Sequence, residues 1–488
     1  MTLVDLLSAL PDASLEAGSS GTEIRRVLHD SRQAAPGDLF VAIRGGRSDG
    51  FAHVSEALSR GVSAVLSEHP APAGVSVAWV RHPRPRQALA LAAARLAGDP
   101  SEKLVLAAVT GTNGKTTTAM LLEALLARRH GAAGLIGTVV YRTGRREVAA
   151  DRTTPDATVL QGYLAEMVAA GIPAAAVEVS SHALALDRVE GCRFDAAVFT
   201  NLTQDHLDFH GTFENYFDAK ARLFAMRKSG APAVVNVEDS WGARLAREVA
   251  RPVTTFAPRG GPADVRVVSS SCDVSGIRLA LDFAGGTAAL ASALVGRFHV
   301  ENLTAAFATG IALGMDARDV VAALETVKAV PGRLERVEAG QPFPIFVDYA
   351  HTEDALRRLL LAVREITEAK IVLVFGCGGD RDKGKRFPMG KTAGELADIP
   401  IATSDNPRGE DPEAILAQVE EGIAASGATK SLRFVDRREA IRAALELANP
   451  GTVVVIAGKG HETSQVLADR EIPFDDRRVA AEIAAGRR

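Results

Sequence analysis

The sequence predicts an α/β protein of three domains, and three observations lead to this fold class. Short β-branched or apolar runs alternate with longer Ala/Leu-rich periodic segments, which is typical of βαβ units with a mainly parallel sheet. A chain of 488 residues is too long for a single hydrophobic core. Two joints rich in Gly and Pro, at residues 98–101 and 330–333, indicate domain linkers.

These joints give the expected domains and their elements. We expect a smaller α/β N-terminal domain at residues 1–100, a central doubly wound domain at 101–332 and a Rossmann-like α/β domain at 333–488. The expected central strands are 105–109, 175–179, 196–199 and 233–236, and the expected helices are 117–129, 158–170 and 216–226. The expected C-terminal strands are 345–348, 371–375, 401–404 and 453–457.

Composition excludes several classes of protein. The chain is 47% hydrophobic and 24% charged, as a globular protein is, and not disordered or fibrous. Lys and Arg number 56 against 60 Asp and Glu, a net charge of −4 that gives no support to nucleic-acid binding. The three cysteines, Cys192, Cys272 and Cys377, are far apart, which suggests neither a disulfide framework nor a thiolate zinc site and fits a reducing cytosol.

The N-terminal residues and the hydropathy pattern predict a cytoplasmic protein without membrane insertion. Asp5 stands where a signal peptide would carry basic residues, so the first residues indicate an amphipathic helix. No stretch reaches the apolar length that crosses a membrane, and even residues 88–97 are interrupted by Arg95. The sequence does not reveal the oligomeric state; we expect a monomer.

A glycine-rich loop follows the strand that ends at Val109. Glycines let consecutive N–H groups converge on phosphate oxygens, and the helix N-terminus that follows adds partial positive charge. Lys115 would reach the β- and γ-phosphates of ATP, and Thr116 would hold Mg²⁺ through its hydroxyl. Val109 breaks the strict P-loop pattern, so the alternative is a Gly-rich turn with an incidental Lys. The predicted nucleotide-binding residues are Gly111, Thr112, Asn113, Gly114, Lys115, Thr116 and Thr117, which makes the central domain P-loop ATPase-like.

A second group of residues narrows the chemistry. Glu178 ends a predicted buried strand, where a carboxylate beside the loop suits Mg²⁺, although a lone Glu there can also be an exposed acid. Two His and two Asp at 205–210 could form a zinc site, but the spacing fits no standard zinc pattern. His206 alone would more often be a helix cap or a packed residue. Lys220 follows on a predicted helix.

The order of these motifs resembles the Mur ligase family, whose members build the peptide of bacterial cell-wall precursors. The resemblance covers nearly the whole chain, and its specificity comes from the combination of motifs. They are DSR at 30–32 with PGDLFVA at 36–42, GTNGKTTT at 111–118, TTP at 153–155, EVSSH at 178–182, NLTQDHLDFH at 201–210 with Lys220, FHVEN at 298–302, PGRLE at 331–335 and DYAH at 348–351.

The resemblance implies roles for the central residues. Lys115, Glu178, His206 and Lys220 would be catalytic, with Thr116, Glu178, His206 and Lys220 as metal ligands or metal-orienting groups. Asn302, Arg333 and Asp348 would place ATP. In the family the lysine at the position of Lys220 is carbamylated. A neutral lysine can add CO₂ and become an anion that attracts metal, whereas most lysines are merely solvated on a helix.

The C-terminal loops are expected to recognise the amino acid substrate, because loops after the strands of an open α/β sheet border its ligand crevice. Asp405, Asn406, Pro407 and Arg408 resemble the signature of ligases that add meso-diaminopimelate. Arg408 can grip that molecule's second carboxylate with two parallel hydrogen bonds. The alternative for this tetrapeptide is an Asx-type turn with an exposed Arg. The resemblance also implies a carboxylate contact from Arg381, an ammonium acceptor in Glu462 and a close backbone approach at Gly458.

The remaining substrate contacts are also implied by the resemblance. Thr153, Thr154, Ser180 and Arg188 would bind the muramoyl dipeptide, and Ser31, Gly46, Arg47 and Ser48 the nucleotide sugar. The chain departs from some relatives at Arg152 and Leu186, where those have Asn and Gln, so no contact is carried over there.

The resemblance thus implies an ATP-dependent amide-bond ligase of peptidoglycan synthesis, which serves cell shape and cell division. It would add meso-diaminopimelate to UDP-N-acetylmuramoyl-L-alanyl-D-glutamate through an acyl phosphate. The alternatives are the lysine-adding ligase, ligases of neighbouring steps and folylpolyglutamate synthase; the tetrapeptide at 405–408 and the N-terminal domain argue against them. A nucleotide-switched P-loop binding protein would leave the C-terminal loops unexplained.

Overall fold

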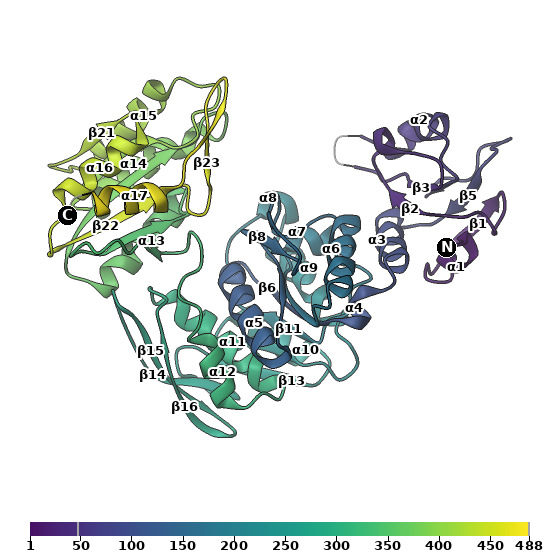
Figure 1. The fold of residues 1–488 in the computed structure, drawn as a ribbon, viewed down its shortest axis with the longest axis horizontal. Coiled ribbons are helices and arrows are strands. Elements are labelled where there is room, and N and C mark those ends of the chain that lie inside the picture. The colour runs from purple at the N-terminus through teal and green to yellow at the C-terminus, as the bar shows by residue number, and fades with distance from the viewer. Residues whose placement is uncertain (46–47, 487–488) are drawn as a thin grey trace. The chain divides into compact units, whose positions relative to one another are not determined.

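The computed structural model describes residues 1–45 and 48–486 and confirms the predicted α/β class (Figure 1). The described chain forms two compact units. The first contains Met1–Arg266 and Asn302–Ala323, and the second contains Val267–Glu301 and Leu324–Arg488. The boundaries expected for three domains stay a prediction.

A five-stranded sheet with the order β1-β5-β4-β3-β2 forms the N-terminal part of the first unit. Strands β2 to β5 are parallel, and β1 pairs antiparallel with β5. Buried side chains of α1 and α3 pack on one face and those of α2 on the other. The elements are α1 (Leu3–Leu7), β1 (Ser14–Ala17), β2 (Arg26–Leu28), β3 (Asp38–Val41), α2 (Val54–Ser59), β4 (Ala64–Ser67), β5 (Ala78–Arg81) and α3 (Pro85–Leu96).

The central sheet of the first unit has the order β13-β12-β11-β6-β10-β7-β8-β9, with β8 and β9 antiparallel at one edge. Strand β14 pairs with the end of β13 and then runs into the second unit. The strands are β6 (Val105–Thr110), β7 (Gly134–Ile136), β8 (Val140–Arg142), β9 (Glu147–Ala149), β10 (Ala174–Glu178), β11 (Ala196–Phe199), β12 (Ala233–Asn236), β13 (Val253–Ala257) and β14 (Val265–Asp273). The helices are α4 (Pro100–Lys103), α5 (Lys115–His130), α6 (Ala157–Ala169), α7 (Ser181–Ala185), α8 (Leu207–His210), α9 (Phe213–Ala225), α10 (Ser240–Glu248), α11 (Phe298–Ala312) and α12 (Ala317–Leu324).

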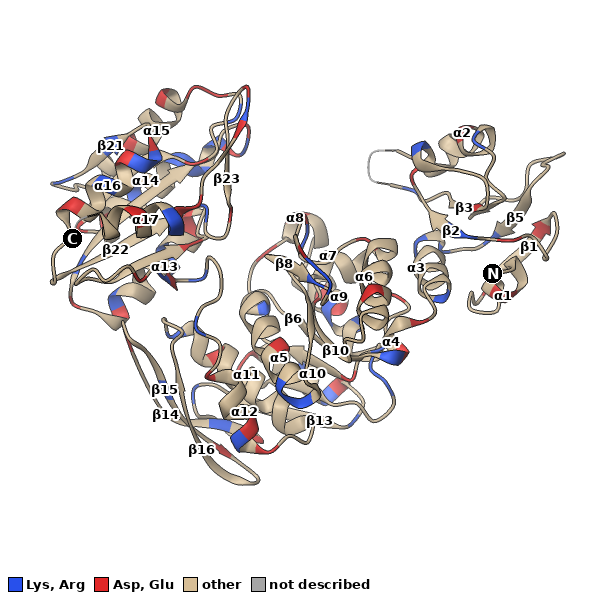
Figure 2. Ribbon diagram, in the orientation of Figure 1, with Lys and Arg blue, Asp and Glu red and all other residues tan. Residues whose placement is uncertain are grey.

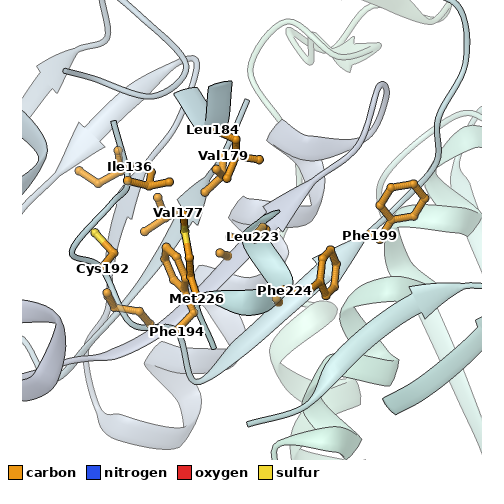
Figure 3. Packing of buried hydrophobic residues seen from close by; sticks show 14 of the residues in the cluster. Ile136, Val177, Val179, Leu184, Cys192, Phe194, Phe199, Leu223, Phe224 and Met226 are labelled. Carbon is orange, nitrogen blue, oxygen red and sulfur yellow. The ribbon is translucent and has the colours of Figure 1, made fainter. Parts of the chain in front are cut away.

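Burial on both faces explains why the central strands are apolar along their whole length, as strands of parallel sheets are. Residues of α6, α7, α9 and α10 pack on one face of this sheet. Figure 3 shows part of this core, with Phe194 before β11, Phe199 at the end of β11, and Leu223, Phe224 and Met226 at the C-terminal end of α9. The core thereby fixes α9, the helix that carries Lys220, against the sheet.

Strands β11 and β12 have the predicted bounds, whereas three helices begin earlier than predicted, α6 by a single residue. Helix α5 starts at Lys115 and not at 117, because the chain turns at Gly114 with φ 85° and enters the helix directly. Helix α9 starts at Phe213 and not at 216, because the Thr212 hydroxyl accepts a hydrogen bond from the Asn215 N–H and caps the helix. The shift of α5 follows from the glycine turn and that of α9 from side-chain capping.

The second unit contains a six-stranded sheet with the order β17-β18-β22-β19-β20-β21, parallel except at β17. Successive β19 residues alternate between two cores, one under α13, α14 and α15 and one under α16 and α17. The elements are β15 (Gly276–Phe283), β16 (Gly286–Ser292), β17 (Glu335–Arg336), β18 (Ile345–Asp348), α13 (Glu353–Ile366), β19 (Lys370–Cys377), α14 (Arg386–Leu396), β20 (Ile399–Ser404), α15 (Pro412–Ala425), β21 (Leu432–Phe434), α16 (Arg437–Leu447), β22 (Thr452–Ala457), β23 (Ser464–Val466), β24 (Glu471–Pro473) and α17 (Asp476–Ala485).

Acidic and basic residues are mixed along the ribbon of the described chain. Figure 2 shows acidic and basic segments interspersed over the helices of each unit, in keeping with the small net charge.

Within the described part of the chain, no helix combines the length and apolarity that a membrane span requires. Cys192, Cys272 and Cys377 are free thiols.

A buried ion pair ties α16 to α17. Arg437 and Asp476 are both 0% exposed and lie 2.7 Å apart. The guanidinium also donates to the Ala457 carbonyl at 2.9 Å, at the end of β22. Burial of two charges is tolerated because each satisfies the other and the remaining donors reach carbonyl oxygens.

We therefore predict that Asp476→Ala destabilises the full chain by about 3–5 kcal/mol, because it leaves a buried guanidinium without its counter-charge. Urea denaturation of the full chain measures the loss. The matched control is Glu482→Ala, which breaks the exposed pair with Arg438 and should cost about 1 kcal/mol or less. Equal losses for the two variants would contradict the role given to the buried pair.

Candidate active site

The parallel register gathers the candidate site at one edge of the central sheet. Strand β6 lies between β10 and β11, with Glu178 opposite Val109 and Phe199 opposite Thr110. The carboxyl ends of parallel strands meet at the same edge. The glycine-rich loop after β6, the carboxylate that ends β10 and the segment after β11 therefore lie side by side.

The loop has the backbone that its glycines permit. Gly111 has φ 154° and Gly114 has φ 85°. A Cβ at Gly111 would overlap Thr200 Oγ1, and one at Gly114 would overlap Asn302 Oδ1. The Thr200 hydroxyl donates to the Asn113 carbonyl at 2.6 Å. A side chain at either position would overlap a neighbouring residue, so the loop can adopt this conformation only with glycine at both.

Lys115 folds over the loop. Its Nζ donates to the Gly111 and Thr112 carbonyls at 3.0 and 2.9 Å. The Thr112 hydroxyl lies 3.1 Å from the hydroxyl of Tyr216 on α9. Thr117, also predicted to bind nucleotide, is buried in the first turn of α5. The loop places its lysine ammonium where the first helical turn begins.

Glu178 is 1% exposed and surrounded by hydroxyl groups. Its Oε2 accepts hydrogen bonds from Thr138 Oγ1 at 2.9 Å and Thr116 Oγ1 at 3.2 Å, and its Oε1 accepts from the Thr138 N–H at 2.9 Å. The predicted pair of Thr116 and Glu178 is therefore in direct contact. Hydroxyl and carboxylate oxygens are the donor set that Mg²⁺ prefers, so these residues fit that ion.

Thr138 is a residue that the sequence reasoning missed. It stands two positions after the short strand β7, which is parallel to β10, and that position was the available signal. A Cβ at the preceding Gly137 would overlap Glu178 Oε1, so glycine there gives the carboxylate its space. The Thr138 hydroxyl also reaches Thr153 Oγ1 at 3.1 Å.

Lys220 is buried, and the alternative of a solvated helix lysine is wrong. It is 1% exposed, and its Nζ donates to the Gly111 carbonyl at 2.7 Å, the same oxygen that Lys115 contacts. The Nζ lies 4.5 Å from the centre of the Tyr216 ring. Burial holds the pKa of Lys220 well below its usual range, and repulsion from Lys115 lowers it further while Asp205 opposes the shift.

His206 occupies the left-handed region, with φ 51°, just before α8. Its side chain is 48% exposed, 3.4 Å from Asp205, and its ring packs edge-on against His182 at 4.6 Å. His210, by contrast, is buried beside Ser181, and burial lowers its pKa to about 4. Within residues 1–45 and 48–486, no three His, Cys, Asp or Glu are grouped to hold a metal. The metal role of His206 stays a prediction.

The residues predicted for the muramoyl dipeptide lie next to Glu178. The Thr154 hydroxyl donates to the Glu178 carbonyl at 2.8 Å and accepts from the Ser180 N–H at 3.1 Å. Arg188 donates to the Thr154 carbonyl at 3.0 Å. Arg152 instead pairs with Asp156 at 3.1 Å. Together with Thr153, this group borders the same sheet edge as the loop.

The residues predicted for the nucleotide sugar belong to the N-terminal sheet region. Ser31 is 6% exposed and donates to Glu56 Oε2 at 2.7 Å. Ser48 is exposed, and its carbonyl accepts from the Gly45 N–H at 2.8 Å. Gly46 and Arg47 lie outside the described residues.

The residues predicted to place ATP are divided between the units. Asn302, at the start of α11, lies against Gly114 and accepts from Thr118 Oγ1 at 3.4 Å in the first unit. In the second unit, the Asp348 carboxylate accepts N–H groups of Leu334 and Ala350, both at 2.8 Å, and burial raises its pKa. The Arg333 guanidinium lies 5.6 Å from the centre of the Tyr349 ring.

The C-terminal loops meet at the carboxyl ends of β19, β20 and β22. Arg408 has φ 50°, and its Nη1 donates to the Gly379 carbonyl at 2.8 Å. Asp380 has φ 51° and accepts from the Gly409 N–H at 2.9 Å. Left-handed backbone at two non-glycine residues in facing loops is strained, and such strain gathers at ligand sites. Arg381, one residue further on, is exposed.

The loop of residues 405–408 is joined to the one after β22. Asn406 Nδ2 donates to Glu462 Oε2 at 3.0 Å. The Asp405 carbonyl accepts from Gln465 Nε2 at 2.6 Å, and a Cβ at Gly458 would lie 2.7 Å from Asp405 Oδ2. Pro407 is buried between them. Asp405, Asn406, Arg408, Gly458 and Glu462 are thus brought together as expected from the sequence.

Three buried basic residues behind these loops were missed. Lys459 lies between Asn406 and Glu462, Arg437 pairs with Asp476, and Arg386 pairs with Glu410 at 2.9 Å. All three are 0% exposed. The available signal for Lys459 was its place between Gly458 and Glu462. Arg437 and Arg386 stand at helix starts and carried no local signal.

Comparisons with known proteins agree with this arrangement. Three family models match in order: the Mur ligase family, catalytic domain at residues 23–96, the Mur ligase middle domain at 109–310 and the Mur ligase, glutamate ligase domain at 332–460.

Full-length relatives give the same result. A UDP-N-acetylmuramoyl-L-alanyl-D-glutamate–2,6-diaminopimelate ligase of Solibacter usitatus (strain Ellin6076) is 43% identical over 100% of this chain and 99% of its own. The ligase of the same name from Gloeobacter violaceus is 47% identical over 96% and 95%. A solved structure with that name is 33% identical, with a TM-score of 0.73 over 100% of this chain and 99% of its own. The resemblance seen in the motifs is confirmed: the chain belongs to the Mur ligase family.

Proposed function

We propose that this protein adds meso-2,6-diaminopimelate to UDP-N-acetylmuramoyl-L-alanyl-D-glutamate with consumption of ATP. The observation that carries the proposal is Arg408, held against Gly379 in the loop whose Asn406 contacts Glu462, in a chain whose full-length relatives are named for this reaction. A guanidinium beside a carboxylate complements an amino acid that carries a second carboxylate and a second ammonium.

The loop after β6 would hold the phosphates of ATP. Its backbone N–H groups and the start of α5 favour negative charge, and Lys115 would leave the loop carbonyls to pair with the β- and γ-phosphates. Thr116 and Glu178 would hold Mg²⁺, which when bound supplies positive charge to the transferring phosphoryl group. Asn302 would contribute from the start of α11, with Arg333 and Asp348 from the second unit.

Lys220 would act as a carbamate. Its amine is buried and its pKa is lowered, so the neutral form that attacks CO₂ is favoured. Addition of CO₂ gives an N-carboxylate and releases one proton. The resulting anion would lie beside Lys115 and the loop and would orient Mg²⁺, with His206 as a further metal-orienting group.

The reaction would proceed through an acyl phosphate. A carboxylate oxygen of the glutamyl substrate attacks the γ-phosphorus of ATP, and ADP leaves. The amine of diaminopimelate then attacks the acyl carbon, and phosphate leaves with the carboxylate oxygen while the amine loses a proton. Thr153, Thr154, Ser180 and Arg188, next to Glu178, would position the glutamyl carboxylate, and exclusion of water would protect the acyl phosphate.

The C-terminal loops would select the amino acid. Arg408 would bind the second carboxylate of diaminopimelate with Arg381 in support, and Glu462 would accept the ammonium. A lysine-adding relative needs no such guanidinium, because lysine lacks the second carboxylate.

We further propose that the protein is a cytoplasmic monomer. The three free thiols are in keeping with a reducing compartment.

We predict that the purified chain with ATP, Mg²⁺ and the UDP-muramoyl dipeptide releases phosphate with meso-diaminopimelate and not with lysine. Phosphate release and the mass of the UDP-linked product are measured in parallel. The discrimination should reach about 100-fold or more in kcat/KM, since loss of a bidentate partner leaves a guanidinium unpaired. Release with lysine alone would overturn the proposed specificity, and release with neither would overturn the proposed ligase.

The matched variant for this assay is Arg408→Lys. It keeps the positive charge but removes the planar pair of donors. The KM for diaminopimelate should rise by about 10-fold or more while the KM for ATP changes by less than about twofold. Equal changes in both KM values would contradict the role of Arg408.

A second prediction concerns Lys220. In protein equilibrated with ¹³C-bicarbonate, NMR should detect a carbamate carbon that is lost in Lys220→Ala, and kcat should fall by about 100-fold. Lys228→Ala serves as control, because Lys228 carries a partly exposed ion pair with Asp195. A carbamate signal that persists in Lys220→Ala, or full activity in that variant, would refute the assignment.

A further inference from the structure

Lys459 is a fully buried lysine among the residues of the C-terminal loops, in a part of the chain separate from the buried Lys220. It follows Gly458 at the end of β22, and its side chain is 0% exposed. Its Nζ donates to Glu462 Oε2 at 2.8 Å and to Asn406 Oδ1 at 3.1 Å. A buried ammonium is costly unless it is paired, so this placement requires both acceptors.

The two acceptors come from different loops. Asn406 belongs to the loop after β20, and Glu462 to the loop after β22. Asn406 also donates from Nδ2 to Glu462 Oε2 at 3.0 Å. Lys459, Asn406 and Glu462 therefore form a closed triangle of hydrogen bonds across the carboxyl ends of two strands.

The triangle constrains Glu462. That side chain is 33% exposed, and a free glutamate on a loop samples several rotamers. The hydrogen bonds from Lys459 and Asn406 both end on Oε2. In the described residues no hydrogen bond is recorded to Oε1, so this oxygen is the one available to a ligand proton.

We propose that Lys459 is a positioning residue for amino acid recognition. It fixes Oε2 of Glu462 and the amide of Asn406 so that Oε1 of Glu462 receives the ammonium of the amino acid substrate. It also offsets the charge of Glu462, so the site binds an ammonium through directed hydrogen bonds and not through net negative charge alone. This inference rests on the proposed function.

A purely structural role for Lys459 predicts loss of folding when it is replaced, whereas a positioning role predicts loss of amino acid binding in a folded protein. Without Lys459, Asn406 Oδ1 keeps the Val466 N–H at 3.0 Å and Glu462 keeps Asn406 Nδ2, so the loops retain hydrogen bonds. Lys459→Met fills a similar volume without the charge. The variant should fold, and its defect should appear in amino acid binding.

The test is the KM of the full chain for meso-diaminopimelate at saturating ATP and UDP-muramoyl dipeptide. Lys459→Met should raise this KM by about 10-fold, the loss typical of one charge-assisted hydrogen bond, and change the KM for ATP by less than about twofold. Lys391→Met is the matched control, because Lys391 forms an exposed pair with Glu395 at 3.8 Å on α14. It should leave both KM values unchanged.

A double-mutant cycle separates positioning from general destabilisation. In a Glu462→Gln background, Lys459→Met should change the KM for diaminopimelate by less than about twofold, because Lys459 acts through Glu462. Independent effects of the two substitutions, or an unchanged KM in the single variant, would overturn the proposal. If Lys459→Met does not fold, Lys459→Gln, which keeps an N–H donor group without the charge, should give an intermediate rise in KM, and an unchanged KM there overturns the proposal equally.

The wild-type chain distinguishes the two levels of inference. Absence of diaminopimelate-dependent phosphate release from wild-type protein would sink the proposed function itself. Activity in wild type together with an unchanged KM in Lys459→Met would sink only the role of Lys459.

Discussion

Glu178 lies opposite Val109, and Phe199 lies opposite Thr110, in neighbouring pairs of one parallel sheet. This register is the constraint on which the rest of the site depends. A shift of one residue would turn Glu178 to the other face of the sheet, because side chains alternate along a strand. The buried apolar residues on both sides of β6 fix the register, so the packing of the core also determines where the Glu178 carboxylate lies.

The same edge of the central sheet holds two lysine side chains close together, although burial disfavours their charged forms. Lys115 and Lys220 both donate to the Gly111 carbonyl, and Lys220 is 1% exposed. Two cations so close repel each other, and burial adds a desolvation cost. A bound polyphosphate would relieve the repulsion, and conversion of Lys220 to an anion would replace the repulsion with attraction to Lys115. The arrangement is therefore better suited to a nucleotide-bound enzyme than to a structural core.

Much of this could be predicted from sequence, for identifiable reasons. Strands β11 and β12 were predicted with the observed bounds because buried parallel strands are short apolar runs. Glu178 could be singled out because it ends such a strand, and Arg408 because it lies in the loop after one, each within a recognisable motif. Thr138 and Lys459 offered only their positions in the chain as a signal, since their contacts with Glu178 and Asn406 reach across 40 and 53 residues. Arg437 was missed because its partner, Asp476, lies 39 residues away on another helix.

The central claim is that ATP is used to activate a carboxylate for amide formation. Its most direct test is transfer of ¹⁸O from the glutamyl carboxylate of the UDP-linked substrate to inorganic phosphate, followed by mass spectrometry of the phosphate after turnover with diaminopimelate. An acyl phosphate predicts one ¹⁸O atom in each phosphate released from fully labelled carboxylate. Unlabelled phosphate, formed at the same rate as the amide product, would contradict the claim.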